Sequence, residues 1–298
     1  TKAKRLKKTY PFIEIYTDPL NDYKISWFFP EKLEKEEANI LKSYFGNKKS
    51  IEDTQIANFA SFLYKSRDLE RIKIREEVFE KVELYFENKE LEHIKKSNTL
   101  DFSSINANLY PYQKEGVEFA VFKKGVIVAD EMGLGKTLQA ITTAILKKDI
   151  FNFKKTLVVC PASVKHQWKH EVLKFSNEKA IVVEGIPDDR NKIYLNDTSF
   201  FHIVNYETIL RDLPFINKSE YDFVILDEAQ KIKNYETKTA NAVKAIEKKH
   251  ALVITGTPLE NKLLDLYSIV QFLDQKFLAP QWEFSYQHCI FDSKHKNK

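Results

Sequence analysis

The segment GVIVADEMGLGKT, from Gly125 to Thr137, joins an apolar run to a glycine-containing turn and to the start of a helical pattern. Val126 to Ala129 is typical of a buried strand. The turn carries Gly133 and Gly135, and the helical pattern begins at Lys136. Glycines let backbone N–H groups close around phosphate oxygens, and the N-terminus of the following helix attracts the same anion. The segment therefore predicts a phosphate-binding loop.

Two side chains after the turn have the chemistry that such a loop needs. Lys136 would reach the β and γ phosphates of a nucleotide, and the Thr137 hydroxyl would ligate Mg²⁺. The general loop pattern has glycine where this chain has Asp130. The alternative interpretation is a glycine turn that only caps a helix. The candidate nucleotide-binding residues of the segment are Asp130, Met132, Gly133, Leu134, Gly135, Lys136, Thr137 and Leu138.

The composition favours a globular protein and argues against a membrane-spanning one. The 298 residues are enough for two domains, or for one large domain with an appendage, and a hydrophobic content of 43% supports a real core. No apolar run approaches the roughly 20 residues that span a bilayer. The formal net charge is only +4, so nucleic-acid binding would depend on local patches. Two cysteines and the lack of a secretory signal favour a cytoplasmic location.

Residues 1–105 form a predicted accessory region. Residues 1–10 carry five basic side chains, which are expected to be a solvated tail and could alternatively touch phosphates. Two β-rich runs between residues 12 and 29 flank the turn-forming DPLND and predict a β-hairpin. Amphipathic helices that pack against each other are then expected; the alternative is that they bind a protein partner. Their apolar positions are Leu33, Ile40, Leu41, Tyr44, Phe45, Ile56, Phe59, Ala60, Leu63, Tyr64, Ile72, Phe79, Val82 and Phe86.

Residues 106–298 alternate between short apolar runs and helical patterns, after a mostly polar segment at 88–108 that marks the domain boundary. This alternation predicts an α/β fold, a parallel sheet with helices on both faces. The expected strands are Val126–Ala129, Leu157–Cys160, Ala180–Glu184, Phe200–Val204, Phe223–Asp227 and Leu252–Thr255. Ligands of such sheets bind beyond the carboxyl ends of the strands, so the chemistry is expected in the loops that follow them.

Paired carboxylates follow one of these strands, where YDFVILD ends in Asp227 and continues with Glu228. A phosphoryl-transfer site needs one carboxylate for the Mg²⁺ shell and another that orients or deprotonates the attacking water. We assign Asp227 to Mg²⁺ and Glu228 to water. An acidic pair alone is more often a solvated surface feature, but its position downstream of a phosphate loop favours the catalytic interpretation.

Several segments together resemble the Swi/Snf family of superfamily-two helicase-like ATPases, in the order in which that family carries them. DEMGLGKT at residues 130–137 resembles motif I, including Asp130, and DEAQKIKN at 227–234 resembles motif II. The other matching segments are LYPYQKEGVEF at 109–119, LVVCPASVKHQWKHE at 157–171, IVNYETI at 203–209, ITGTPLEN at 254–261 and DLYSIVQFL at 265–273. Gln230 stands where many relatives have histidine. The resemblance covers roughly residues 106–290 and not the accessory region.

This resemblance implies a RecA-like first lobe of the P-loop NTPase type that uses ATP and Mg²⁺. Lys136, Asp227 and Glu228 are the implied catalytic residues. The adenine-sensing role falls on Gln113, whose amide can both donate to and accept from adenine. Residues implied in nucleic-acid contact or in coupling it to the nucleotide are Ser163, Asn205, Tyr206, Thr255, Gly256 and Thr257. Trp168 lies on the apolar stripe of its helix, so we expect core packing there, with base stacking as the alternative.

The resemblance further implies an ATP-dependent double-stranded DNA translocase or remodeller. In that family a second RecA-like lobe supplies the arginines that stabilise the transition state of γ-phosphoryl transfer. Nothing after Phe291 could build that lobe. We therefore expect weak hydrolysis by the 298 residues alone. Two alternatives stay open: a strand-separating DNA or RNA helicase, and a non-catalytic nucleotide-dependent scaffold. The expected location is the cytoplasm, with the nucleoid in bacteria or the nucleus in eukaryotes.

Overall fold

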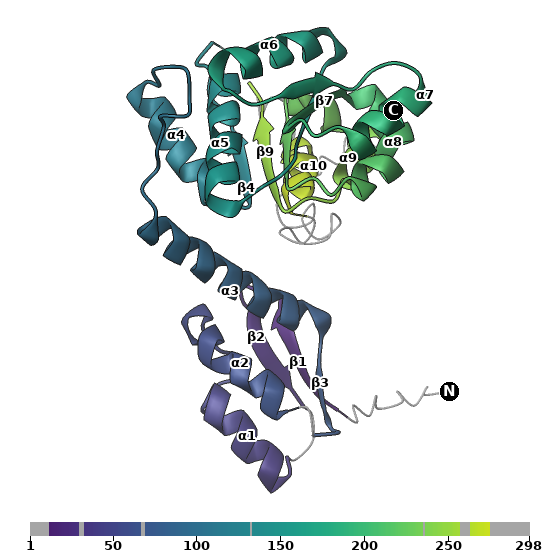
Figure 1. Cartoon of the computed structure of the whole chain (residues 1–298). Helices are drawn as coiled ribbons and strands as arrows, with labels where there is room; N and C mark the ends of the chain where they lie inside the picture. The colour runs from purple at the N-terminus through teal and green to yellow at the C-terminus, as the bar shows by residue number, and fades with distance from the viewer. Residues whose placement is uncertain are drawn as a thin grey trace, which may run out of the picture. The chain divides into compact units, whose positions relative to one another are not determined.

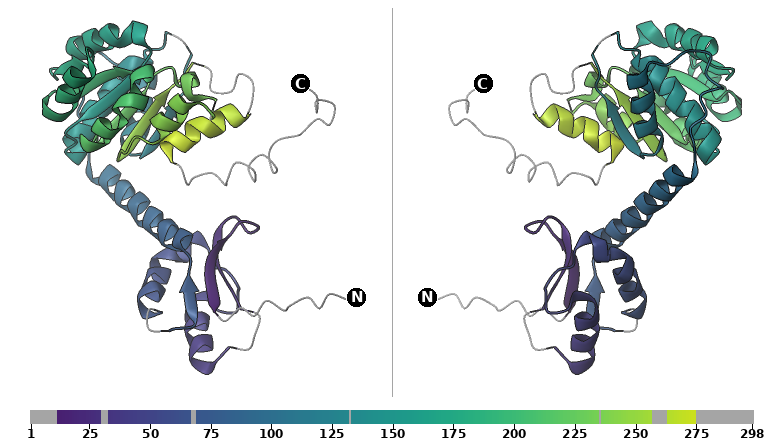
Figure 2. Two further views of the ribbon diagram at one scale, coloured as in Figure 1. Left: turned by 90° about the vertical axis from the view of Figure 1, so that its right-hand side faces the viewer. Right: turned by 90° about the vertical axis from the view of Figure 1, so that its left-hand side faces the viewer.

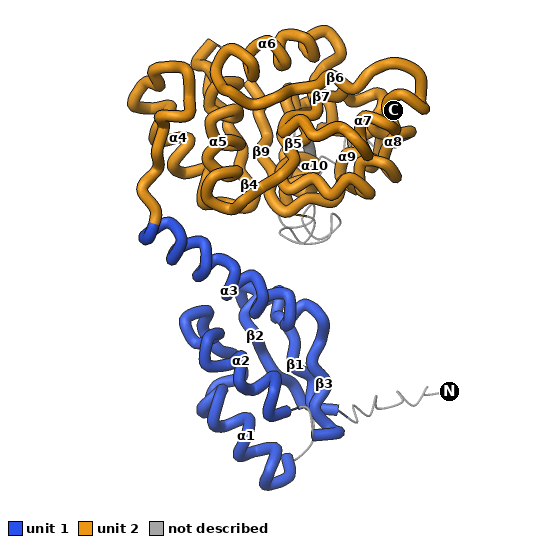
Figure 3. The backbone as a smooth tube through the Cα atoms, in the orientation of Figure 1, with its two compact units in different colours: residues 1–97 blue, residues 98–298 orange. Residues whose placement is uncertain are grey.

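The chain divides between Ser97 and Asn98 into two units, coloured separately in Figure 3. The computed structural model describes residues 12–29, 33–66, 69–131, 133–234, 236–256 and 263–274. Two predicted site residues, Met132 and Thr257, lie outside these described residues.

The division comes earlier in the chain than the boundary expected after residue 105. Ile105 is only 6% exposed, and the N–H of Asn106 donates to Phe175 O at 2.8 Å. The backbone hydrogen bond thus attaches this part of the mostly polar segment to α6 of the second unit. Polarity alone does not reveal such an anchor.

The first unit is built on a three-stranded sheet of order β2-β1-β3. The hairpin is confirmed: β1 (Ile13–Asp18) pairs antiparallel with β2 (Lys24–Phe28). Strand β3 (Ile72–Ile74) pairs parallel with β1. The sequence assigned Ile72 to a helix with Phe79 and Phe86, and this was wrong. Those two phenylalanines are 47% and 45% exposed, because their helix, which starts at Glu76 after the strand, buries the face that carries Val78 and Val82.

Three helices of the first unit share one hydrophobic core with this sheet. They are α1 (Lys35–Phe45), α2 (Ile56–Lys65), preceded by the short η1 (Asp53–Gln55), and α3 (Glu76–Ser97). Ile13 and Ile15, two apart on β1, share a core cluster with Phe59 and Phe62 of α2 and with Val82 of α3. Successive side chains of a strand point to opposite faces, so the side chains of Ile13 and Ile15 lie on the face of the sheet that packs against the helices.

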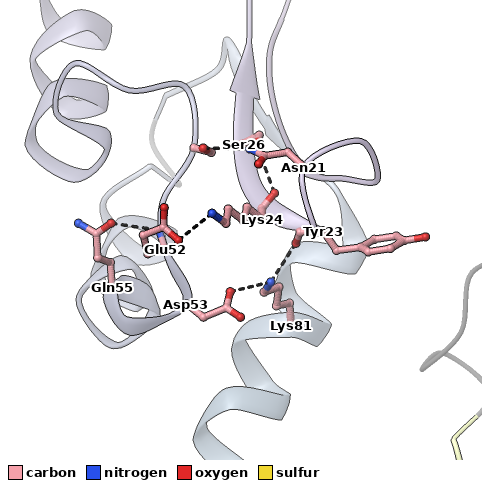
Figure 4. Close-up of polar contacts among 9 residues, drawn as sticks. Asn21, Tyr23, Lys24, Ser26, Glu52, Asp53, Gln55 and Lys81 are labelled. Carbon is pink, nitrogen blue, oxygen red and sulfur yellow. Dashed lines mark hydrogen bonds and ion pairs between the residues drawn. The ribbon is translucent and has the colours of Figure 1, made fainter.

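The hairpin turn is attached to the rest of the first unit by two lysines (Figure 4). Lys81 of α3 donates to Tyr23 O at 2.9 Å and pairs with Asp53 at 2.7 Å. Lys24 pairs with Glu52 at 2.8 Å. These contacts hold a turn in which Tyr23 adopts a left-handed backbone conformation, with φ of 53°.

The second unit contains a six-stranded sheet of order β4-β9-β8-β5-β7-β6, in which every pair is parallel. The strands are β4 (Gly125–Val128), β5 (Thr156–Cys160), β6 (Ala180–Val182), β7 (Phe201–Asn205), β8 (Phe223–Leu226) and β9 (His250–Ile254). Figure 1 shows these strands surrounded by the helices of the unit. Both the predicted α/β fold and its parallel sheet are confirmed.

Helices cover both faces of this sheet, as predicted (Figure 2). Helices α4 (Pro111–Val121), α5 (Lys136–Phe151) and α6 (Lys165–Phe175) pack side by side on one face. The other face carries α7 (Pro187–Asn196), α8 (Tyr206–Lys218), α9 (Lys238–Lys244) and α10 (Leu263–Leu273). Two short helices, η2 (Ala162–Val164) and η3 (Ala229–Ile232), follow β5 and β8. Among the described residues, none of the helices combines the length and the apolar composition that a membrane-spanning helix needs.

The strand order brings two distant loops to one edge of the sheet. Strand β9 lies between β4 and β8, and all three run in the same direction. Adjacent strands are about 4.8 Å apart, so the carboxyl ends of β4 and β8 are separated by roughly 10 Å. The predicted phosphate loop and the paired carboxylates follow these two ends.

Candidate active site

The loop after β4 contains two glycines with left-handed backbone conformations. Gly133 and Gly135 have φ of 84° and 74°, and Gly135 is the N-cap of α5. A Cβ on Gly135 would lie 2.5 Å from Gln113 Nε2, whereas one on Gly133 would meet no described atom within 4 Å. Position 135 therefore requires glycine because of its backbone conformation and because Gln113 leaves no room for a Cβ. Position 133 requires glycine because of its conformation alone.

Lys136 begins α5 and closes the loop through its own side chain. Its Nζ donates to Asp130 O at 2.7 Å and to Glu131 O at 2.8 Å. Phosphate oxygens are stronger acceptors for an ammonium group than carbonyl oxygens, because both partners are then charged. The ammonium group is thus placed at the loop, where it can exchange these two carbonyls for phosphate oxygens.

Asp130, which departs from the general loop pattern, is tied to α5. Its Oδ2 accepts a hydrogen bond of 2.9 Å from Gln139 Nε2, and Gln139 is buried. Gln139, about one helical turn into α5, therefore holds the Asp130 carboxylate at the start of the loop.

Gln113 lies against the loop, as its predicted role requires, but its amide already has backbone partners. The side chain is 4% exposed; Nε2 donates to Leu134 O at 3.1 Å, and Oε1 accepts from Tyr110 N at 3.0 Å. The Tyr112 hydroxyl donates to the same Leu134 carbonyl at 3.2 Å. Adenine recognition by Gln113 stays a prediction: these contacts use one of the two Nε2 protons and one of the two Oε1 lone pairs.

Asp227 is held at its backbone and its side chain directly after β8. Its N–H donates to Val159 O at 2.9 Å, its carbonyl accepts from the Tyr206 hydroxyl at 2.7 Å, and its Oδ2 accepts from Trp168 Nε1 at 2.8 Å. Burial raises the pKa of the Asp227 carboxyl, and the nearby charge of Glu228 raises it further, while the Trp168 hydrogen bond opposes the shift. The structure thus presents a fixed, partly buried carboxylate.

Glu228 has a left-handed backbone, with φ of 54°, and begins a polar chain across the sheet edge. Gln230 Nε2 donates to Glu228 Oε2, and Gln230 Oε1 accepts from the Thr255 hydroxyl at 3.4 Å. Thr255 follows β9 and is fully buried. The second carboxylate is therefore connected to the end of the strand that lies between the loop and Asp227.

These residues form a donor set that fits a magnesium-bound triphosphate. Thr137 and Asp227 supply hydroxyl and carboxylate oxygens, the ligands that Mg²⁺ prefers. Lys136 and the N-terminus of α5 supply positive charge for phosphate. Lys136, Thr137 and Asp227 all lie at the carboxyl edge of the sheet. Glu228 supplies a second carboxylate at this edge.

The residues predicted to contact nucleic acid divide into two groups. Ser163 in η2 is exposed, and Asn205 at the end of β7 is half-buried with its amide donating to Glu207 at 2.7 Å. Tyr206, in contrast, is only 2% exposed, and its hydroxyl binds Asp227 O. A phosphate contact by Tyr206 is therefore incompatible with its burial. Gly256 follows β9 at the same edge of the sheet.

Sequence reasoning named Trp168 and Tyr206 but did not predict that these two aromatic side chains hold Asp227. Trp168 is 2% exposed, which confirms the expected core packing. A buried indole N–H nearly always needs an acceptor. The sequence contained that signal, but it did not identify Asp227 as the acceptor.

Several known proteins are similar to this chain in sequence. Residues 112–297 match the family described as SNF2-related domain. An uncharacterized ATP-dependent helicase of Mycoplasma genitalium is 36% identical over 63% of this chain and 19% of its own length. TATA-binding protein-associated factor MOT1 of Saccharomyces cerevisiae is 35% identical over 61% of this chain and 11% of its own length. The chain therefore spans under a quarter of either relative.

A solved structure, the Sulfolobus solfataricus SWI2/SNF2 ATPase core in complex with dsDNA, has the same fold. It is 38% identical to this chain, with a TM-score of 0.58, over 63% of this chain and 40% of that one.

Proposed function

This chain belongs to the SNF2-related domain family, and from that membership we propose that it is the ATP-binding lobe of a double-stranded DNA translocase or remodeller. One observation carries the ATP part of the proposal: Lys136 and Asp227 follow parallel strands that a single strand separates. The DNA part is supported by the similar SWI2/SNF2 core that was solved with dsDNA.

Each residue of the candidate site has a defined role in this proposal. Lys136 binds the β and γ phosphates, and Thr137 and Asp227 hold the Mg²⁺. When bound, Mg²⁺ would neutralise charge on the phosphate oxygens. Glu228 orients the attacking water and accepts its proton. The Gln230 amide that donates to Glu228 keeps this carboxylate beside the sheet edge.

Full activity in this proposal requires a second lobe. Arginines supplied to the transition state are worth roughly 10³ to 10⁵ in rate in phosphoryl transfer. We therefore assign such arginines to a second RecA-like lobe and expect slow hydrolysis by residues 1–298 alone. Hydrolysis by these residues at the rate of a DNA-stimulated two-lobed protein would contradict this assignment.

DNA contact is assigned to residues at the carboxyl ends of β5 and β7. These strands are neighbours in the sheet; the exposed Ser163 follows β5, and the half-buried Asn205 is the last residue of β7. Hydroxyl and amide groups of this kind bind phosphate oxygens without reading the base sequence. The assignment therefore concerns the phosphate backbone of the duplex.

The decisive test is the substitution Glu228→Gln in a two-lobed protein that contains this chain. Duplex-stimulated ATP turnover should be abolished while ATP binding is retained, because glutamine keeps the shape but cannot accept the proton of water. Glu220→Gln is the matched control: Glu220 also has a left-handed backbone, with φ of 53°, but it precedes β8. Turnover should be unchanged in that control.

The nucleic acid that stimulates turnover separates the alternatives. Stimulation by duplex DNA supports a translocase or remodeller, whereas stimulation by single strands or RNA would favour a strand-separating helicase. Retained turnover in Glu228→Gln would remove Glu228 from catalysis. No ATP hydrolysis under any of these conditions would favour a nucleotide-dependent scaffold.

A further inference from the structure

Asp227 receives a hydrogen bond from a buried tryptophan of another helix. The Trp168 indole N–H on α6 lies 2.8 Å from Asp227 Oδ2, and Trp168 is 2% exposed. The indole has a single polar proton, so this contact uses its whole hydrogen-bonding capacity. The carboxylate is thereby fixed through Oδ2, and Oδ1 is the oxygen that the indole does not hold.

We propose that Trp168 is a positioning residue for the metal site: it orients the Asp227 carboxylate so that its other oxygen is presented to Mg²⁺. The inference rests on the proposed function, because it assumes that Asp227 binds Mg²⁺ there. Groups that orient metal-binding carboxylates typically contribute about 10- to 100-fold to metal affinity. Trp168 meets the requirement for such a group, since a rigid, buried ring can hold only one orientation.

The contacts of the Asp227 backbone strengthen this inference. The Tyr206 hydroxyl donates to Asp227 O at 2.7 Å, and the Asp227 N–H donates to Val159 O at 2.9 Å. With both backbone groups bound, the remaining freedom of Asp227 is the rotation of its side chain. Trp168 restricts that rotation from α6, together with the backbone N–H of Glu228, which also donates to the carboxyl group.

A purely structural role for Trp168 makes a different prediction. If the hydrogen bond only satisfied a buried donor, its loss would lower stability and leave the Mg²⁺ dependence of nucleotide binding unchanged. Trp168→Phe keeps an aromatic ring and removes the N–H. Tyr194→Phe is the matched control, because it removes another buried hydrogen bond of the same unit, from Tyr194 to Asp212 Oδ2 at 3.1 Å, outside the site.

The test measures binding of a fluorescent ATP analogue to the 298-residue chain while Mg²⁺ is titrated. In Trp168→Phe the Mg²⁺ concentration for half-maximal binding should rise about ten-fold. Binding without Mg²⁺ should be unchanged, and Tyr194→Phe should behave as wild type. An unchanged Mg²⁺ midpoint in folded Trp168→Phe would overturn the inference alone. Failure of the wild-type chain to bind the analogue with Mg²⁺ would overturn the proposed function as well.

A second measurement needs no substitution at Trp168. The chain has three tryptophans, Trp27, Trp168 and Trp282, whose indole N–H groups give separate nuclear magnetic resonance signals. Trp27→Phe and Trp282→Phe assign the Trp168 signal by elimination. Adding Mg²⁺ to the nucleotide-bound chain should shift the Trp168 signal, because the carboxylate that accepts its proton then binds the metal. A Trp168 signal that stays in place when Mg²⁺ binds would contradict the positioning role.

Discussion

Lys147 Nζ lies 2.7 Å from His250 Nδ1, so two basic side chains share one hydrogen bond inside the second unit. Lys147 is 1% exposed and also donates to Val121 O at 2.7 Å and Lys123 O at 2.9 Å. These contacts connect α5 to the end of α4 and to the start of β9. Burial lowers the pKa of Lys147 to about 7, and burial together with the Lys147 charge lowers the pKa of His250 to about 3.

The buried lysine predicts that stability rises with pH above neutrality. The pKa of Lys147 is about 7 in the folded chain and 10.5 as its ordinary value. Between these values the unfolded chain binds a proton that the folded chain has released, so raising the pH favours folding. The slope is at most about 1.4 kcal/mol per pH unit. Lys147→Met should remove this contribution.

Hydrogen exchange of the β9 amides between pH 7 and 10 measures the effect within the second unit, after correction for the intrinsic exchange rate. The nearby charges of Lys124 and Lys249 are present in both proteins, so the difference between them isolates Lys147. If the corrected exchange rates of the β9 amides depended on pH in the same way in wild type and Lys147→Met, the folded chain would keep this lysine protonated.

The two glycines of the phosphate loop should respond differently to alanine. Both substitutions place a Cβ on a left-handed backbone, which costs about 1–2 kcal/mol. Gly135→Ala should cost about 1 kcal/mol more, because its Cβ displaces Gln113 Nε2 from Leu134 O. Denaturant unfolding of the ligand-free chain gives both values.

A double-mutant cycle identifies the cause of that difference. In a Gln113→Ala background the displaced amide is gone, so Gly135→Ala and Gly133→Ala should become equally costly. A difference that persists without Gln113 would mean that the loop requires Gly135 for another reason.

A buried ion pair between α7 and α8 predicts a large loss of stability when one partner is removed. Arg190 donates through two nitrogens to both Asp212 oxygens at 2.7 Å, and the residues are 7% and 2% exposed. Asp212→Ala should cost about 3–5 kcal/mol, because it leaves the guanidinium buried and unpaired. Tyr194→Phe, which removes only a hydroxyl from Asp212, should cost about 1 kcal/mol. Similar costs for the two variants in urea unfolding would contradict this account.

The sequence predicted the sheet of the second unit well because its strands are buried on both faces. Runs such as LVVC at 157–160 and Phe223–Leu226 are apolar throughout, and turn or helix signals separate them. Strand β3 was missed for the opposite reason. Its three residues, Ile72–Ile74, are too short for a periodic signal, and its parallel partner β1 is far away in the sequence.

The candidate site was predictable where spacing fixes the geometry and not where packing does. Gly135, Lys136 and Asp227 lie at the expected ends of strands and helices. The partners of Gln113 and the burial of Tyr206 depend on how separate elements meet, which a local pattern does not contain. Trp168 illustrates the limit: its burial was predictable from helical spacing, but its acceptor was not.

The most direct test of a single magnesium-bound triphosphate site is a crystal structure of the chain with a non-hydrolysable ATP analogue and Mn²⁺ in place of Mg²⁺. Anomalous scattering would locate the metal independently of the protein. We predict one metal peak between the Thr137 hydroxyl and the Asp227 carboxylate, bound to each directly or through one water, with Lys136 on the β and γ phosphates. A nucleotide bound with its metal away from Asp227, or with its phosphates away from Lys136, would contradict the account.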